Sequence, residues 1–158
     1  ANFQPLWACS DPQVDELTVP VVGDERADWQ YSIGSVLATG ARVAFGSDWP
    51  VSSPDPLQLM HVAVNRTLSE RYGRAGTREC EVPLRASEAV SALDALSAFT
   101  TGVAYLNHDE DVVGELRVGR RADAAVLDQD VLAIESRRIG ETSVDLTLAG
   151  GDVVFERA

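Results

Sequence analysis

The architecture of this chain is read most directly from the stretch Gly40-Ala41-Arg42-Val43-Ala44-Phe45-Gly46-Ser47-Asp48-Trp49-Pro50-Val51. Residues 41–45 form a short run bounded by two glycines, which predicts a buried strand. Before it, apolar residues recur at three- and four-residue steps, so a helix is expected from Glu25 to Thr39 with a stop at Gly40. These apolar residues are Trp29, Ile33, Val36 and Leu37. Helix, glycine, strand and polar loop in this order are typical of an α/β barrel or a doubly wound sheet.

The loop after this strand contains the main candidate for chemistry. Three prolines stiffen residues 47–56, and Asp48 lies just past the end of the strand. Catalytic groups of parallel α/β barrels converge at this end. A carboxylate there can hold a divalent metal, or take a proton from a metal-bound water and pass it to a leaving group. The alternative, open on these residues alone, is that Asp48 only caps the next turn or helix.

Further elements are expected on both sides of this loop. The apolar beginning, residues 1–7, is strand-like, and helical spacing continues from Pro56. Residues 71–81 are charged and predict an exposed loop. Ser91 followed by Asp94 forms a capping box for another helix. The apolar face of that helix is expected to be Leu93, Leu96 and Phe99, with a break at residues 100–102 before a short helix over residues 103–106.

The character of the chain changes after Asn107. Four short runs rich in β-forming residues follow, at residues 112–118, 122–127, 144–148 and 153–156. Residues 119–121 give a turn signal, and Gly150-Gly151 suits the positive φ angles of a tight hairpin. The last fifty or so residues are therefore expected to be β-structure appended to an α/β portion.

Composition excludes several partners. The chain has 158 residues and a formal net charge of −12, and all 13 basic residues are Arg. Nucleic acids and anionic membranes need clustered basic residues, so neither is an expected partner. No apolar stretch is long enough to cross a bilayer and no secretion signal is visible. Cys9 and Cys80 form no paired motif and are expected to be ordinary thiols of a reducing cytoplasm.

Several segments together resemble one known family. Residues 40–51 resemble the eighth barrel strand and loop of the amidohydrolase superfamily, in the branch that includes the N-substituted formamide deformylases. The resemblance extends in order and spacing over nearly the whole chain. The other matching segments are Gln4-Pro5 (seventh strand), Ala63-Val64-Asn65-Arg66 (helix after the Asp loop), residues 93–100 (helix leaving the barrel) and residues 114–128, which are similar to the family segment Gly-x-Leu-x-x-Gly-x-x-Ala-Asp.

The resemblance implies an α/β fold made of the C-terminal part of a TIM barrel, with about its last two strands and helices, followed by strands of a small flanking β-sandwich. It divides the chain into residues 1–108 and 109–158. It implies a metal-dependent hydrolase of C–N bonds in amide or formamide-like small molecules. Asp48 takes the role of metal ligand and general base. Trp49 and Pro50 are expected to wall the substrate pocket, the alternative being that they stiffen the loop.

The family's other metal ligands, a His-x-His pair, a bridging lysine or its substitute and two further histidines, have no counterparts here. The chain has two histidines and no lysine, so we expect an inactive C-terminal fragment whose parent enzyme binds a divalent metal, zinc by resemblance. A severed barrel exposes apolar faces, so a homo-oligomer is expected. Two alternatives stay open: an oligomerisation or interaction module without chemistry, and a relative of the family that has lost its metal.

Smaller roles are expected for the remaining polar residues. His61 is expected in packing or at the surface and His108 in a solvated turn. Asn65 and Arg66 are expected to brace the structure, and Asp123 to make a turn or packing contact.

Overall fold

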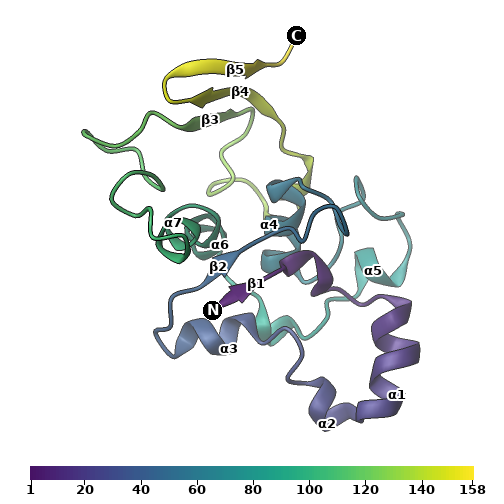
Figure 1. Ribbon diagram of the computed structural model, residues 1–158. Helices are drawn as coiled ribbons and strands as arrows, with labels where there is room; N and C mark the ends of the chain where they lie inside the picture. Colours follow the sequence, from purple (N-terminus) through teal and green to yellow (C-terminus); the bar gives the residue numbers. More distant parts are fainter.

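The computed structural model describes residues 1–158 as a mixed helix and strand structure (Figure 1). The elements are β1 (Asn2–Phe3), α1 (Val19–Val22), α2 (Asp24–Ala27), α3 (Ile33–Ala38), β2 (Ala44–Phe45), α4 (Pro56–Asn65), α5 (Arg78–Glu81), α6 (Ala92–Phe99), α7 (Thr101–Leu106), β3 (Ala124–Leu127), β4 (Val144–Ala149) and β5 (Asp152–Glu156). Less regular helices are the 3₁₀ helices Pro5–Trp7, Ala86–Glu88 and η4 (Ser136–Glu141), and the π-helix η2 (Gln13–Thr18).

β1 and β2 form a parallel pair in which Asn2 faces Ala44 and Phe3 faces Phe45. The strands expected at both places are present, though each is only two residues long. α6 and α7 lie against β2 (Figure 1). α7 comes so close at Gly102 that a Cβ there would collide with the carbonyl oxygen of Val43. A parallel pair covered by helices is the arrangement predicted for this part, while its membership of a barrel stays a prediction.

The single helix expected from Glu25 to Thr39 is wrong, because the structure divides it into α2 and α3. Tyr31, between them, has a left-handed φ of 54°, which no helix continues through. The helical spacing holds only from Ile33, which is fully buried. Trp29, taken as part of the same face, is 73% exposed.

The helices after the Asp loop agree well with the predicted starts. The carboxylate of Asp55 accepts a hydrogen bond from Leu57 N at 2.9 Å and so caps α4. The hydroxyl of Ser91 accepts from Asp94 N at 3.0 Å, which confirms the capping box of α6. The expected apolar face of α6 is corrected, since Leu93 is 60% exposed and the alanines at 95 and 98 are the buried residues. In the loop expected over residues 71–81, α5 forms and buries Cys80.

The C-terminal part forms a three-stranded antiparallel sheet in the order β3-β4-β5. Three of the four predicted strands are confirmed, and Gly150 and Gly151 turn the β4–β5 hairpin with φ of 62° and 92°. The strand expected over residues 112–118 is wrong, because that segment folds into turns. Gly114 has a φ of 95°, and Val118 is fully exposed with no strand beside it. β-propensity alone does not make a strand without a partner edge.

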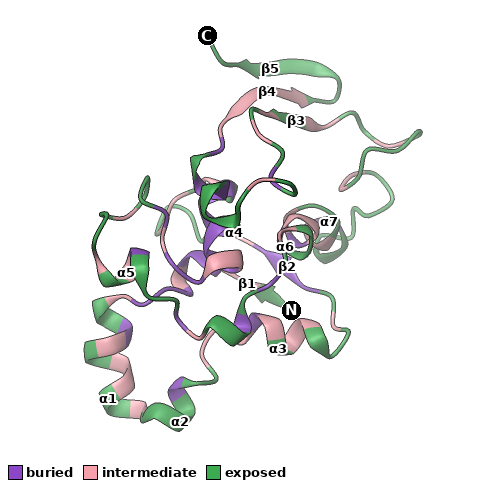
Figure 2. Cartoon of the chain, turned by 180° about the vertical axis from the view of Figure 1, so that it is seen from behind, coloured by how far each residue is buried: buried purple, intermediate pink, exposed green.

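The main core lies between the β1–β2 pair, α4 and α6 (Figure 2). It contains sixteen buried apolar residues, among them Ile33, Leu59 and Val62 with essentially no exposed surface. Phe45 of β2 meets Phe99 of α6 edge to face, with ring centroids 5.3 Å apart. Only Val131 and Ile139 of this core follow His108. None of the helices has the length and apolar character needed to span a membrane.

Candidate active site at the end of β2

The parallel pairing of β1 and β2 brings their carboxyl ends to the same end of the molecule (Figure 1). The chain leaves β1 through Gln4 and leaves β2 through Gly46. A Cβ built on Gly46 would lie 3.8 Å from Asn2 Oδ1 and 3.9 Å from Gln4 Nε2, so these amide side chains flank the start of the Asp loop. The sequence-predicted catalytic position therefore lies where two strand ends and two polar side chains meet.

Asp48 has a left-handed backbone with a φ of 57°. Aspartate is among the few residues that visit this region, at a cost of about 1 kcal/mol, and such residues cluster at functional sites. The turn holds it there: the Asp48 carbonyl accepts from Val51 N at 2.8 Å, and the hydroxyl of Ser52 donates to the carbonyl of Ser47. The loop geometry thus fixes the direction in which this side chain leaves the backbone.

The carboxylate of Asp48 is exposed and makes no hydrogen bond or ion pair within the chain. Capping is carried out by other side chains. Ser47 Oγ accepts from Trp49 N at 3.2 Å, and Asp55 caps α4. The capping alternative for Asp48 is therefore wrong, and the carboxylate is free to act on something outside these residues.

Trp49 and Pro50 follow Asp48 on the same exposed loop, joined by a cis peptide bond. The Trp49 side chain is 67% exposed. Neither residue lines the cavity between α3, β2, α6 and α7 or the one beside His61, so their assignment to a substrate pocket stays a prediction.

No three His, Cys, Asp or Glu side chains come together in an arrangement that holds a metal ion. Neither histidine lies in a group of possible metal ligands. His61 is buried on α4, and His108 lies exposed in a turn with a φ of 62°. A catalytic zinc takes three protein ligands, and other divalent cations also need several oxygen ligands. The residues of this chain do not fit a complete metal site, because Asp48 is one ligand at most.

A buried polar network on α4 was missed by sequence reasoning. Gln58 Nε2 donates to the carbonyl of Gly140 at 2.7 Å, and the Gly140 amide donates to His61 Nδ1 at 3.3 Å. The hydroxyl of Ser69 donates to Gln58 Oε1. Burial and the nearby positive charge of Arg137 lower the pKa of His61 to about 4, so its imidazole is neutral near pH 7. The only signal in the sequence was Gln58 and His61 inside a helix whose other residues before Asn65 are apolar.

The bracing roles expected for Asn65 and Arg66 agree with the structure. Asn65 Nδ2 donates to the carbonyl oxygens of His61 and Ser136, at 3.0 and 2.9 Å. Arg66 has no exposed surface, and its Nε donates to the carbonyl of Leu84 at 2.9 Å. Burial lowers the pKa of Arg66 to about 10.

Asp123 makes the turn contact expected of it. Its Oδ1 accepts from Gly150 N at 2.8 Å, which ties β3 to the β4–β5 hairpin. The hydrogen bond from Arg121 and then that from Gly150 lower the pKa of this carboxyl below its usual value.

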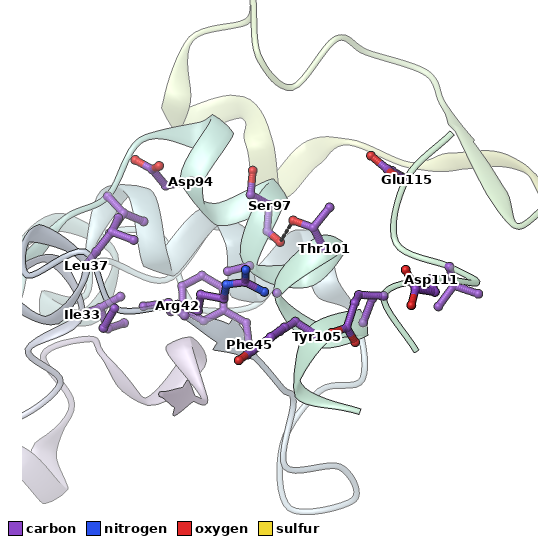
Figure 3. A pocket seen from close by; sticks show the side chains of 18 of the residues that line it. Ile33, Leu37, Arg42, Phe45, Asp94, Ser97, Thr101, Tyr105, Asp111 and Glu115 are labelled. Carbon is purple, nitrogen blue, oxygen red and sulfur yellow. Dashed lines mark hydrogen bonds between the residues drawn. The ribbon is translucent and has the colours of Figure 1, made fainter. Parts of the chain in front are cut away.

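A cavity of about 540 Å³ lies between α3, β2, α6 and α7 (Figure 3). Its wall includes Ile33, Val43 and Phe45, and the Arg42 guanidinium stacks on the ring of Tyr105 at 3.8 Å from its centre. The cavity does not include Asp48. The structure therefore does not bring the predicted catalytic residue to this cavity.

Comparison with known proteins gives one family. The model of the "Amidohydrolase family" matches residues 1–155. N-substituted formamide deformylase of Arthrobacter pascens is 31% identical over 127 residues, which are 80% of this chain and 22% of that protein. YtcJ of Bacillus subtilis, which carries an amidohydrolase name, is 27% identical over 99% of this chain and 28% of its own length.

The chain is also similar to a solved structure. The crystal structure of an uncharacterized metal-dependent hydrolase from Pyrococcus horikoshii superposes with a TM-score of 0.67 and 29% identity. The match covers 85% of this chain and 25% of that one. The chain thus spans about a quarter of the length of the relatives it matches.

Proposed function

The chain belongs to the amidohydrolase family, and on that premise we propose that it forms the C-terminal part of a metal-dependent hydrolase acting on C–N bonds. The substrate class is a small molecule with an amide or formamide-like linkage, supported by the likeness to a formamide deformylase. The single observation that carries the proposal is the free carboxylate of Asp48, held in a left-handed turn at the carboxyl end of β2.

Asp48 acts in this proposal as a general base. Its carboxylate has no partner to displace, so it is able to accept a proton from an attacking water. The protonated acid then returns that proton to the leaving nitrogen, so that water adds across the C–N bond with no net change in the side chain. Trp49 and Pro50, next in the loop, form part of the wall that excludes solvent from the substrate.

A metal requires more than this chain provides. Since Asp48 alone does not complete a coordination shell, the divalent cation, zinc by family resemblance, needs ligands from outside the 158 residues. The 158-residue chain is inactive in this proposal, and activity belongs to the longer protein. A cytoplasmic location is part of the proposal, supported by the two free buried thiols.

The test compares Asp48→Asn with Asp152→Asn in the longer protein, using hydrolysis of an N-substituted formamide. Loss of a general base is expected to lower kcat about 10²- to 10⁴-fold. Asp152 is an exposed carboxylate on β5 without an ion pair, so its variant is expected to retain the wild-type rate. A fully active Asp48→Asn enzyme refutes the assignment.

A second candidate function is association without chemistry. β1 and β2 pair only with each other, and α7 covers β2 at the Val43 carbonyl, so the edge left without a strand is that of β1. A sheet edge without a neighbouring strand favours pairing with another strand. In this second proposal the chain self-associates into a homo-oligomer, and light scattering at low concentration tests it. A stable monomer counts against this candidate without touching the role of Asp48.

A further inference from the structure

A second, smaller cavity lies where the C-terminal part meets α4. Its volume is about 180 Å³. α4, the turn over residues 67–71 and η4 contribute its walls, so side chains more than sixty positions apart in sequence line the same space. Asp48, Trp49 and Pro50 do not reach it.

His61 points a hydrogen-bond donor into this cavity. The imidazole is only 3% exposed, and its Nδ1 accepts the amide hydrogen of Gly140 at 3.3 Å. A neutral imidazole that accepts at Nδ1 carries its proton on Nε2. That N–H has no acceptor within the chain, and His61 lines the cavity, so a molecule bound there is able to accept its hydrogen bond.

Two guanidinium groups line the mouth of the same cavity. Arg71 reaches only the carbonyl oxygen of Thr142 and the hydroxyl of Ser143, both at 3.4 Å, and Arg137 has no ion pair. Two carboxylates also line it. Glu141 is already paired with Arg138 at 3.3 Å, which leaves Glu70 as the one unpaired carboxylate beside two unpaired guanidinium groups.

We infer that this cavity is a binding site for a small oxoanion, with the His61 N–H at its floor and Arg71 and Arg137 at its mouth. Carboxylate and phosphate oxygens share the chemistry that these donors recognise, because guanidinium groups bind either one in a bidentate manner. One water occupies about 30 Å³, so the cavity holds a group of carboxylate or phosphate size with water to spare. A bound anion joins η4 to α4 and so fastens the C-terminal part to the core.

The experiment follows the imidazole resonances of His61 by NMR at pH 7 while inorganic phosphate, or separately acetate, is added. Ionic strength is held constant with sodium chloride, so screening does not change. A saturable shift with either anion supports the site, and the anion with the lower Kd shows whether tetrahedral or carboxylate oxygens are preferred. A shift that never saturates, or equals that of chloride, overturns the inference.

Variants locate the binding. Arg71→Gln and Arg137→Gln are each expected to weaken the Kd at least tenfold, since each removes a charge-assisted contact. Arg74→Gln is the matched control: Arg74 is also exposed, lies close in sequence and does not line the cavity, so its Kd is expected to stay at the wild-type value. Both Arg71 and Arg137 are exposed, so their variants are expected to fold. Equal Kd values for Arg71→Gln, Arg137→Gln and the wild type contradict the site.

Discussion

The parts of the chain before and after His108 differ in the length of their secondary-structure elements and in how much of them is buried. The first part has two-residue strands, short helices and several left-handed residues, and yet it supplies nearly all of the buried core. The second part has the longer ladder of β3, β4 and β5, with a register shift in each strand pair, and yet every residue of β5 is exposed. Strand pairing and burial are therefore separate properties: a ladder forms from local pairing, whereas burial needs a second layer opposite it.

The largest expected difference between the two parts is in the unfolding free energy that is lost when an apolar side chain is truncated to alanine. Leu59→Ala removes a side chain with no exposed surface from the centre of α4, and about 3 kcal/mol of unfolding free energy should be lost with it. Val154→Ala on β5 removes one that is 61% exposed, with an expected cost within about 0.5 kcal/mol. Urea denaturation of both variants measures the contrast. Equal losses indicate that the sheet is buried in solution against something outside these residues.

The junction between the parts is expected to weaken in acid. The pKa of His61 is about 4 in the folded chain against a usual 6.5, so the unfolded chain takes up the proton first as the pH falls. The contribution of neutral His61 to the free energy of unfolding is fully present above about pH 6.5. It declines as the pH falls towards 4, by up to about 3 kcal/mol. The measurement is urea denaturation across that window. The control His108→Gln should keep this pH dependence and His61→Gln should lose it, and identical profiles for the two variants argue against the pKa shift.

Gly140 tests the fit of η4 against α4 without altering charge. A Cβ at this position collides with that of Ser69 and comes within 3.1 Å of His61 Nδ1. Gly140→Ala is therefore expected to cost about 2 kcal/mol through overpacking. Gly46→Ala is the comparison, because its nearest neighbour atom would be 3.8 Å away, an ordinary contact. Thermal melts that shift equally for both variants show that the junction is looser than the structure indicates.

The smallest expected effect concerns the start of a helix in the first part. Ser91→Ala removes the acceptor for Asp94 N at the beginning of α6, which is worth about 1 kcal/mol. Ser97→Ala, on the same helix, keeps the cap and is expected to change unfolding free energy less. Denaturant midpoints of the two variants decide between them, and a neutral Ser91→Ala shows that tertiary packing alone holds this helix.

Sequence reasoning succeeded where a local signal determines a local structure. Asp55 and Ser91 cap the helices predicted to follow them, and Gly150-Gly151 turns the predicted hairpin. It failed where the local structure depends on contacts with distant parts of the chain. The helical spacing of apolar residues from Trp29 to Ile33 predicted one helix, but Tyr31 between them has a left-handed backbone. The β-rich run at residues 112–118 forms no strand, because no neighbouring strand pairs with it.

For the candidate site, the sequence predicted Asp48 and the family; the comparisons confirm the family, and the role of Asp48 stays a prediction. The free state of the carboxylate was not predictable, because it depends on Ser47, Ser52 and Asp55 making the hydrogen bonds of the loop instead. The cavity at His61 was equally hidden. Its walls come from segments that meet only when η4 packs on α4.

By itself the sequence determined the capping box at Ser91, the hairpin glycines, the α/β character and the family, since each depends on residue type and short-range spacing. Only the tertiary structure decided which apolar residues are buried, which carboxylate stays free at the end of β2, and which donors converge beside His61. The physical reason is that burial and hydrogen-bond partnership belong to pairs of segments distant along the chain, and those pairs exist only once the backbone has folded.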